Sequence, residues 1–156
     1  MQFLCPMHRQ HFARFPLEAK KDLWLRWMEN ARTHSEQGQW REVIALAGSA
    51  FELACLEGAP DEPCLHIELT LSAILLSGVL ADHGDSAAVE RVIYRALSYL
   101  QDDGHHTASQ HCCGLGECVS VLIDHSRQAA FFADYLNWPS LPFGDQHRVS
   151  LAVTFH

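Results

Sequence analysis

Cysteine and histidine side chains gather in two short segments, and both residue types can bind a metal or carry redox chemistry. One segment is CPMHRQH, which contains Cys5, His8 and His11. The other is HHTASQHCCGLGEC, residues 105–118, with three histidines and three cysteines in fourteen positions. A turn at Pro6 can direct the Cys5 thiolate and the His8 imidazole onto one cation. The first segment therefore predicts part of a zinc site.

A complete zinc site needs about four ligands, so we expect another donor from residues 105–118 or from water. If a helix begins at Thr107, no two histidines or cysteines of that segment lie three or four residues apart, and they form no ligand pair among themselves. Cys112 and Cys118 instead fall on apolar helix stripes and are predicted to pack in the core. The ligands of the zinc hypothesis are therefore Cys5, His8, His11 and Cys113.

Familiar catalytic motifs do not occur in the sequence. It has no glycine-rich phosphate loop, no G-x-S-x-G elbow and no H-E-x-x-H pair. We therefore expect a protein that is not an enzyme and that needs no cofactor, with zinc as the alternative. Two cysteine-based alternatives stay open: a redox switch at the vicinal Cys112 and Cys113, and a Cys-His dyad assembled from distant positions.

The composition is that of one globular domain spanning residues 1–156. Of its residues, 48% are apolar and 19% are charged, and no apolar run approaches the roughly 18 residues that span a bilayer. The start, MQFLCPMHRQHF, lacks the pattern of a secretory signal, so we expect a cytoplasmic protein with reduced cysteines.

Charge is distributed unevenly along the chain. Residues 1–41 carry a net charge of +3, and the remainder carries −11. The acidic body argues against nucleic acid as a partner, and the lack of a spanning segment argues against a membrane. The two parts of the chain either form two solvated surfaces of opposite charge, or the basic N-terminal segment docks on the acidic body of its own chain or of a partner.

Apolar residues recur at three- and four-residue spacing over most of residues 16–138, which predicts an all-α fold. Gly38 and Gly84 are expected at the turns of two helical hairpins. The segment between Cys64 and Gly84 is apolar nearly all round, which is typical of a helix in the centre of a fold. Trp24, Trp27 and Trp40 are expected in the hairpin cores. The helical segments are 17–37, 39–58, 64–84 and 85–101.

A third hairpin is expected in the C-terminal part of the helical region. Thr107 and Gln110 form a capping box that begins a helix, and the chain then continues to Trp138 with a break at residues 124–126. The fold class is therefore an array or bundle of about six antiparallel helices in three hairpins. Residues 1–15 form a Cys/His segment before it, and residues 139–156 form a tail.

The tail has a different pattern. In HRVSLAVTFH, the apolar Val149, Leu151 and Val153 alternate with more polar residues, which predicts a short half-buried β-strand. Such a strand must pair with residues 2–5, with a second subunit or with a partner's sheet edge. The alternative is a tail that packs as irregular coil.

The first two hairpins also match each other at a constant offset of 46 residues. Small residues fall where the helices are expected to cross, and glycine falls at each turn. Over residues 24–100 this pattern resembles the tetratricopeptide repeat, a helix-turn-helix unit of about 34 residues. The longer period reflects the loop EGAPDEPC. The matched residues are Trp27, Ala31, Gly38, Val43, Ala47 and Ala50 with Ala73, Ser77, Gly84, Val89, Ile93 and Ala96.

The resemblance implies a helical superhelix with a concave, partner-binding face. Its groove positions would be Met28, Arg32, Ser35, Glu36, Ile74, Gly78 and Asp82. We therefore expect a protein-protein interaction module that binds a protein or peptide segment, with a homodimer as one form of self-association. The predicted contact residues are Arg32, Glu36 and Asp82 in the groove, and Val149, Leu151 and Val153 in the strand. A zinc-dependent regulator or sensor is the alternative.

Overall fold

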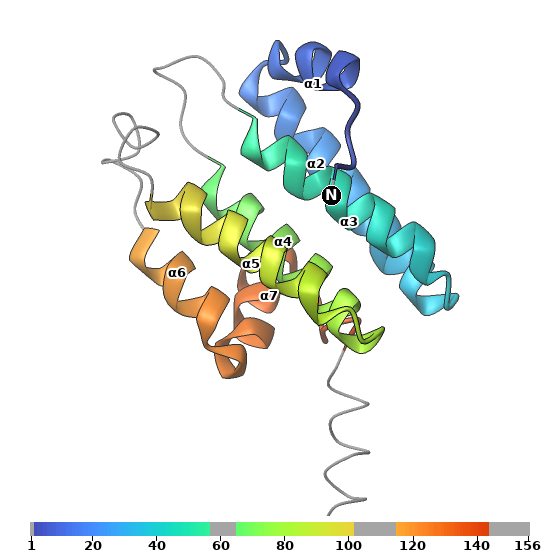
Figure 1. The fold of residues 1–156 in the computed structure, drawn as a ribbon, viewed down its shortest axis with the longest axis vertical. Helices are drawn as coiled ribbons and strands as arrows, with labels where there is room; N and C mark the ends of the chain where they lie inside the picture. Colours follow the sequence, from blue (N-terminus) through green and yellow to red (C-terminus); the bar gives the residue numbers. More distant parts are fainter. Residues whose placement is uncertain (1, 57–64, 102–114, 144–156) are drawn as a thin grey trace, which may run out of the picture.

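The computed structural model describes residues 2–56, 65–101 and 115–143, and every regular element in these ranges is a helix. The all-α prediction is therefore confirmed. Figure 1 shows that helices that follow one another in the sequence pack side by side. No described helix has both the length and the apolar character needed to cross a membrane. The helices are α1 (Pro6–Ala13), α2 (Leu17–Glu36), α3 (Trp40–Cys55), α4 (His66–Asp82), α5 (Ser86–Gln101), α6 (Leu115–Ile123), the 3-10 helix η3 (His125–Arg127) and α7 (Gln128–Leu136).

Helices α2 with α3, and α4 with α5, form the two expected hairpins. Gly38 and Gly84 lie at their turns with φ angles of 72° and 78°. Residues with a β-carbon rarely adopt this left-handed conformation, so glycine lets the chain reverse within three residues at each turn. Ala50 and Ala96, which match at the offset of 46, are both fully buried. The two hairpins thus share turn chemistry and close helix crossings.

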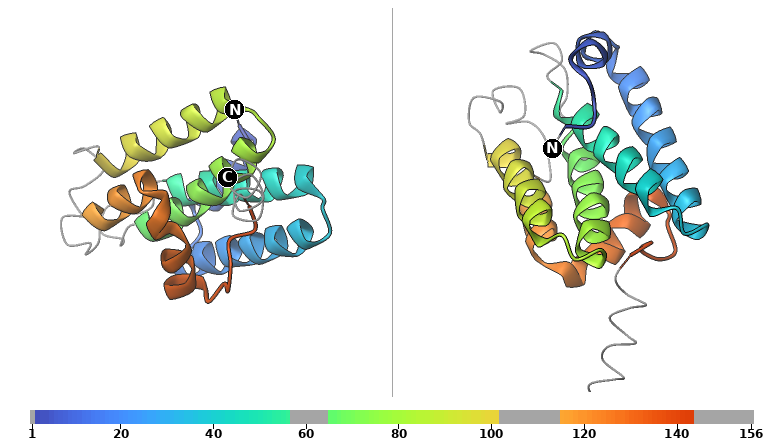
Figure 2. Two further views of the ribbon diagram at one scale, coloured as in Figure 1. Left: turned by 90° about the horizontal axis from the view of Figure 1, so that it is seen from below. Right: turned by 45° about the vertical axis from the view of Figure 1, so that its right-hand side comes forward.

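Helix α4 is the central helix. It lies between α3 and α5, and α6 also packs against it (Figure 2). Most of its side chains are buried, as the all-round apolar pattern predicted. Each fully buried Leu or Ile contributes about 1.5 to 3 kcal/mol of transfer free energy, so this helix holds much of the hydrophobic core.

The break predicted at residues 124–126 separates α6 from α7. Asp124 caps η3, because its carboxylate accepts hydrogen bonds from the Ser126 hydroxyl at 2.6 Å and from the Ser126 N–H at 3.1 Å. These bonds hold the pKa of Asp124 below its ordinary value. The predicted cap at Thr107 and the cysteine pair that follows it lie outside the described residues.

Helix α1 was not expected, because the first fifteen residues looked like a Cys/His segment. Pro6 occupies the first helical turn, where its missing N–H costs nothing. Phe12 on α1 packs edge-on against Trp27 of α2, with ring centroids 5.7 Å apart. This contact buries part of a short helix that would be marginal in isolation.

The N-terminal segment is attached to the body through the buried carboxylate of Glu52 on α3, which is 1% exposed. Its two oxygens accept hydrogen bonds from the N–H groups of Phe3 at 2.8 Å and Leu4 at 2.9 Å. Arg9 of α1 and Arg95 of α5 form ion pairs with it at 2.8 Å and 3.5 Å. One side chain therefore joins the N-terminus, α1, α3 and α5.

Replacing this carboxylate should detach the N-terminal segment. We expect Glu52→Ala to lower the free energy of unfolding by about 2 to 4 kcal/mol, because it removes two charged hydrogen bonds and two ion pairs at a buried position. Urea denaturation followed by circular dichroism measures this loss. Glu42→Ala, at an exposed position of the same helix, is the control, and equal losses in the two variants would contradict the role assigned to Glu52.

Candidate partner-binding site

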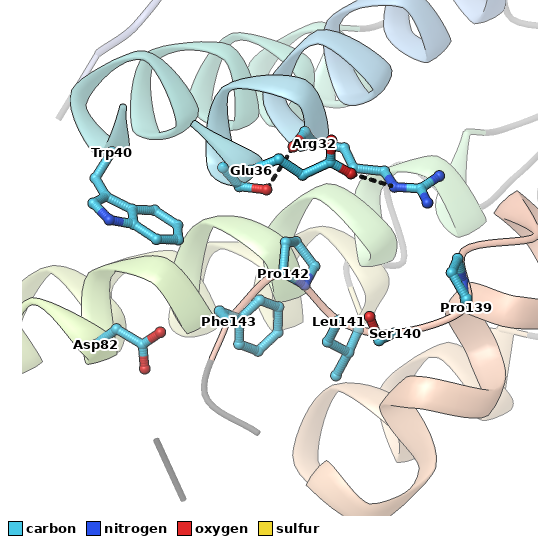
Figure 3. A pocket seen from close by; sticks show the side chains of 10 residues that line it. Arg32, Glu36, Trp40, Asp82, Pro139, Ser140, Leu141, Pro142 and Phe143 are labelled. Atoms are coloured by element: carbon cyan, nitrogen blue, oxygen red, sulfur yellow. Dashed lines mark hydrogen bonds and ion pairs between the residues drawn. The ribbon is translucent and has the colours of Figure 1, made fainter. Parts of the chain in front are cut away.

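A pocket of about 420 Å³ lies between the ends of α2 and α4 and the segment that follows α7 (Figure 3). Arg32, Ser35 and Glu36 contribute from the last turns of α2. Trp40 contributes from the first turn of α3, and Asp82 from the end of α4. The remaining lining residues belong to the C-terminal segment and are Pro139, Ser140, Leu141, Pro142 and Phe143.

The three groove contacts predicted from the sequence lie together in this pocket. Arg32 and Glu36 form an ion pair at 3.9 Å on one face of α2. Glu36 and Asp82 are separated by 46 residues, the offset of the repeat, and therefore occupy equivalent ends of equivalent helices. Trp40, which we expected in the hairpin core, is partly buried and lines the pocket.

The rest of the expected groove is closed. Met28 and Ile74 are fully buried, and Gly78 is covered by the ring of Phe143. A β-carbon added at Gly78 would overlap that ring, so only glycine permits this approach. The open part of the face is therefore the end that carries Glu36 and Asp82.

Trp138 joins the C-terminal segment to α2. It is 1% exposed, and its indole N–H donates a hydrogen bond to Glu29 at 3.3 Å. The guanidinium of Arg32 lies over its ring, 5.6 Å from the centroid, and Phe132 of α7 packs on it at 5.2 Å. Arg32 is thereby oriented by both Trp138 and Glu36.

The lining combines an apolar surface with an excess of negative charge. Trp40, Leu141, Pro142 and Phe143 supply the apolar part, and two carboxylates outnumber one guanidinium. The lining contains neither cysteine nor histidine. Such a surface suits an apolar side chain with a basic group beside it.

The N-terminal zinc candidates are only partly brought together. Cys5 precedes α1 directly, and its sulfur lies 3.2 Å from Nδ1 of His8, with both side chains exposed. His11 packs its ring edge-on against Phe15 at 5.1 Å. The described residues contain no group of three or more potential metal ligands. Cys113 lies outside the described residues, as do Val149, Leu151 and Val153.

Other ionisable groups are buried away from the pocket. Burial raises the pKa of the Cys55 thiol to about 12 and also raises the pKa of the Cys118 thiol. Cys118 packs in the core, as its position on an apolar stripe predicted. Burial raises the pKa of Glu68 on α4 as well. The two thiols are structural residues, whereas Cys5 is open to solvent.

Three residues of this arrangement were not recognised from the sequence: Glu52, Trp138 and Phe143. Glu52 interrupts the apolar run AFELAC, and a charged residue within such a run signals a buried ion pair. Trp138 and Phe143 flank the two prolines of WPSLPF, a pattern that indicates an extended segment with an aromatic anchor at each end.

Comparisons with protein-family models, with curated proteins and with solved structures gave no match.

The thiols should differ sharply in reactivity. We expect iodoacetamide to modify Cys5 in the native protein while Cys55 and Cys118 stay unmodified until the chain unfolds. Burial keeps the reagent away from these two thiols and disfavours their reactive thiolate form. Peptide mapping by mass spectrometry assigns each modified cysteine, and Cys5→Ser is the control for the first site. Modification of Cys118 at the rate of Cys5 would contradict the burial described here.

Proposed function

We propose that the protein is a non-enzymatic interaction module that binds a short segment of a partner protein in the pocket between α2 and α4. The observation that carries the proposal is the placement of Glu36 and Asp82. These equivalent residues of two repeated helices line one pocket together with Trp40 and an apolar segment. A repeated array that presents equivalent side chains to one face is a common way to bind an extended peptide.

The chemistry of the pocket indicates the kind of segment. An apolar side chain of the partner would lie against Trp40, and a lysine or arginine beside it would pair with Glu36 and Asp82. The resemblance to tetratricopeptide units supports this location, because Arg32, Glu36 and Asp82 correspond to groove positions of such units. The free thiols of the described cysteines suit a cytoplasmic setting.

A peptide library displayed on phage tests this proposal. We expect the protein to enrich peptides with an apolar residue next to a basic one. Affinity for the synthesised peptides should fall about fivefold in the double variant Glu36→Gln/Asp82→Asn and about tenfold in Trp40→Ala. Fluorescence anisotropy measures these affinities.

The matched control is Glu90→Gln, which neutralises an exposed acid of α5 and should leave the affinity unchanged. Enrichment of no peptide, or binding that is insensitive to all three pocket substitutions, would contradict the proposal.

Metal binding at the N-terminus is a second candidate function, favoured by the 3.2 Å contact between Cys5 and His8. Two ligands from one chain leave a tetrahedral zinc ion incomplete. We propose that residues 105–118, with Cys113 as the first choice, or a second copy of the chain complete the site. The protein would then act as a metal-dependent regulator or sensor.

Elemental analysis of the purified protein tests the metal site. We expect one zinc ion per chain, or per pair of chains, after gel filtration in buffer that contains zinc. Cys5→Ser and His8→Ala should lose the metal, and His11→Ala should retain it because that ring packs against Phe15. A wild-type protein without bound metal would reject this candidate.

A further inference from the structure

The segment from Asn137 to Phe143 lies on the helical face as a bound peptide would. Trp138 and Phe143 are its two buried side chains. Trp138 contacts Glu29 and Arg32 of α2, and Phe143 packs on Gly78 of α4. Figure 3 shows Pro139 to Phe143 of the segment beside Arg32 and Glu36 of α2. The two aromatic side chains, which lie outside the two matching hairpins in the sequence, therefore connect α2 with α4.

The backbone of this segment is nearly independent of the helices. Asn137 ends α7 in the left-handed conformation, with a φ angle of 58°. Pro139 and Pro142 have no N–H and favour an extended chain. Within the described part of the chain, no backbone hydrogen bond joins residues 138–143 to a helix. Side chains hold the segment in place, as in the recognition of proline-rich peptides.

We propose that this face recognises extended segments with two aromatic anchors separated by prolines, and that Trp138–Phe143 is its tethered, competing occupant. The proposal rests on the proposed function and names the partner's chemistry. A partner segment would place its anchors against Glu29 and Gly78, and its basic residue would reach Glu36 and Asp82. It would have to displace the chain's own segment first.

Tethering determines how strongly the two occupants compete. A segment attached to the same chain has an effective concentration in the millimolar range. A free peptide of similar chemistry therefore binds the wild-type protein weakly. Weakening the tethered anchors while leaving the helices intact removes this competition, so the affinity for a free peptide increases.

A labelled peptide of the sequence NWPSLPFG, residues 137–144, is the probe. We expect Phe143→Ala in the full chain to bind it at least about tenfold more tightly than wild type. Trp138→Phe, which keeps a ring but loses the hydrogen bond to Glu29, should give a smaller increase. Fluorescence anisotropy measures binding, and circular dichroism with thermal melting shows whether each variant is folded.

Two helical glycines provide a matched pair of variants. Gly78 lies under Phe143, and Gly48 of α3 lies under Phe3 in the same manner. In the Phe143→Ala background, Gly78→Ala should abolish binding of the probe because its methyl group fills the anchor site. Gly48→Ala should not change binding, because it alters an equivalent ring contact elsewhere in the molecule.

Three results would overturn the proposal. The first is a folded Phe143→Ala or Trp138→Phe protein that binds the probe no better than wild type. The second is an equal effect of the two glycine substitutions. The third is a wild-type dimer in light scattering that the probe dissociates, which would identify a second copy as the occupant. If library peptides bind through Asp82 equally in wild type and Phe143→Ala, this inference fails and the proposed function stands.

Discussion

The arrangement of the N-terminal segment, α1, α3 and α5 depends on the hydrogen bonds and ion pairs of one buried carboxylate, that of Glu52. A charge at this depth is unfavourable unless it is paired and hydrogen-bonded. Two N–H groups and two arginines satisfy it, and they come from the N-terminal segment, α1 and α5. Arg95 also lies over the ring of Phe51, 5.4 Å from its centroid. Any other placement of the N-terminus would leave this carboxylate without most of its partners.

At the opposite end of the chain, the C-terminal segment decides how much of the repeated face is open. Trp138 and Phe143 cover the middle of the face, and the pocket remains at the ends of α2 and α4. Side chains hold the segment on this face, because no backbone hydrogen bond joins residues 138–143 to the described helices.

Much of the helical body could be predicted from local patterns. The all-round apolar character of residues 66–82 indicated the central helix, and Gly38 and Gly84 marked the hairpin turns. Helix α1 was missed because CPMHRQH has ligand residues and little apolar periodicity, and its stability comes from Phe12 packing on Trp27. The acidic positions of the pocket, Glu36 and Asp82, are among the groove positions that the resemblance to the tetratricopeptide repeat implied. The covering of Gly78 could not be predicted, because Phe143 lies 65 residues further along the chain.

The sequence by itself determined the fold class, the two repeated hairpins and the break after α6, since each follows from residues a few positions apart that share a helix face or a turn. The tertiary structure alone decided which partners satisfy Glu52, where Trp138 and Phe143 lie, and that Glu36 and Asp82 share one pocket with Phe143. The contacts of Glu52, and those of Trp138 and Phe143 with α2 and α4, join residues that are 43 to 109 positions apart. No periodicity specifies such pairings, because they depend on shape and charge complementarity that exists only once the helices are packed.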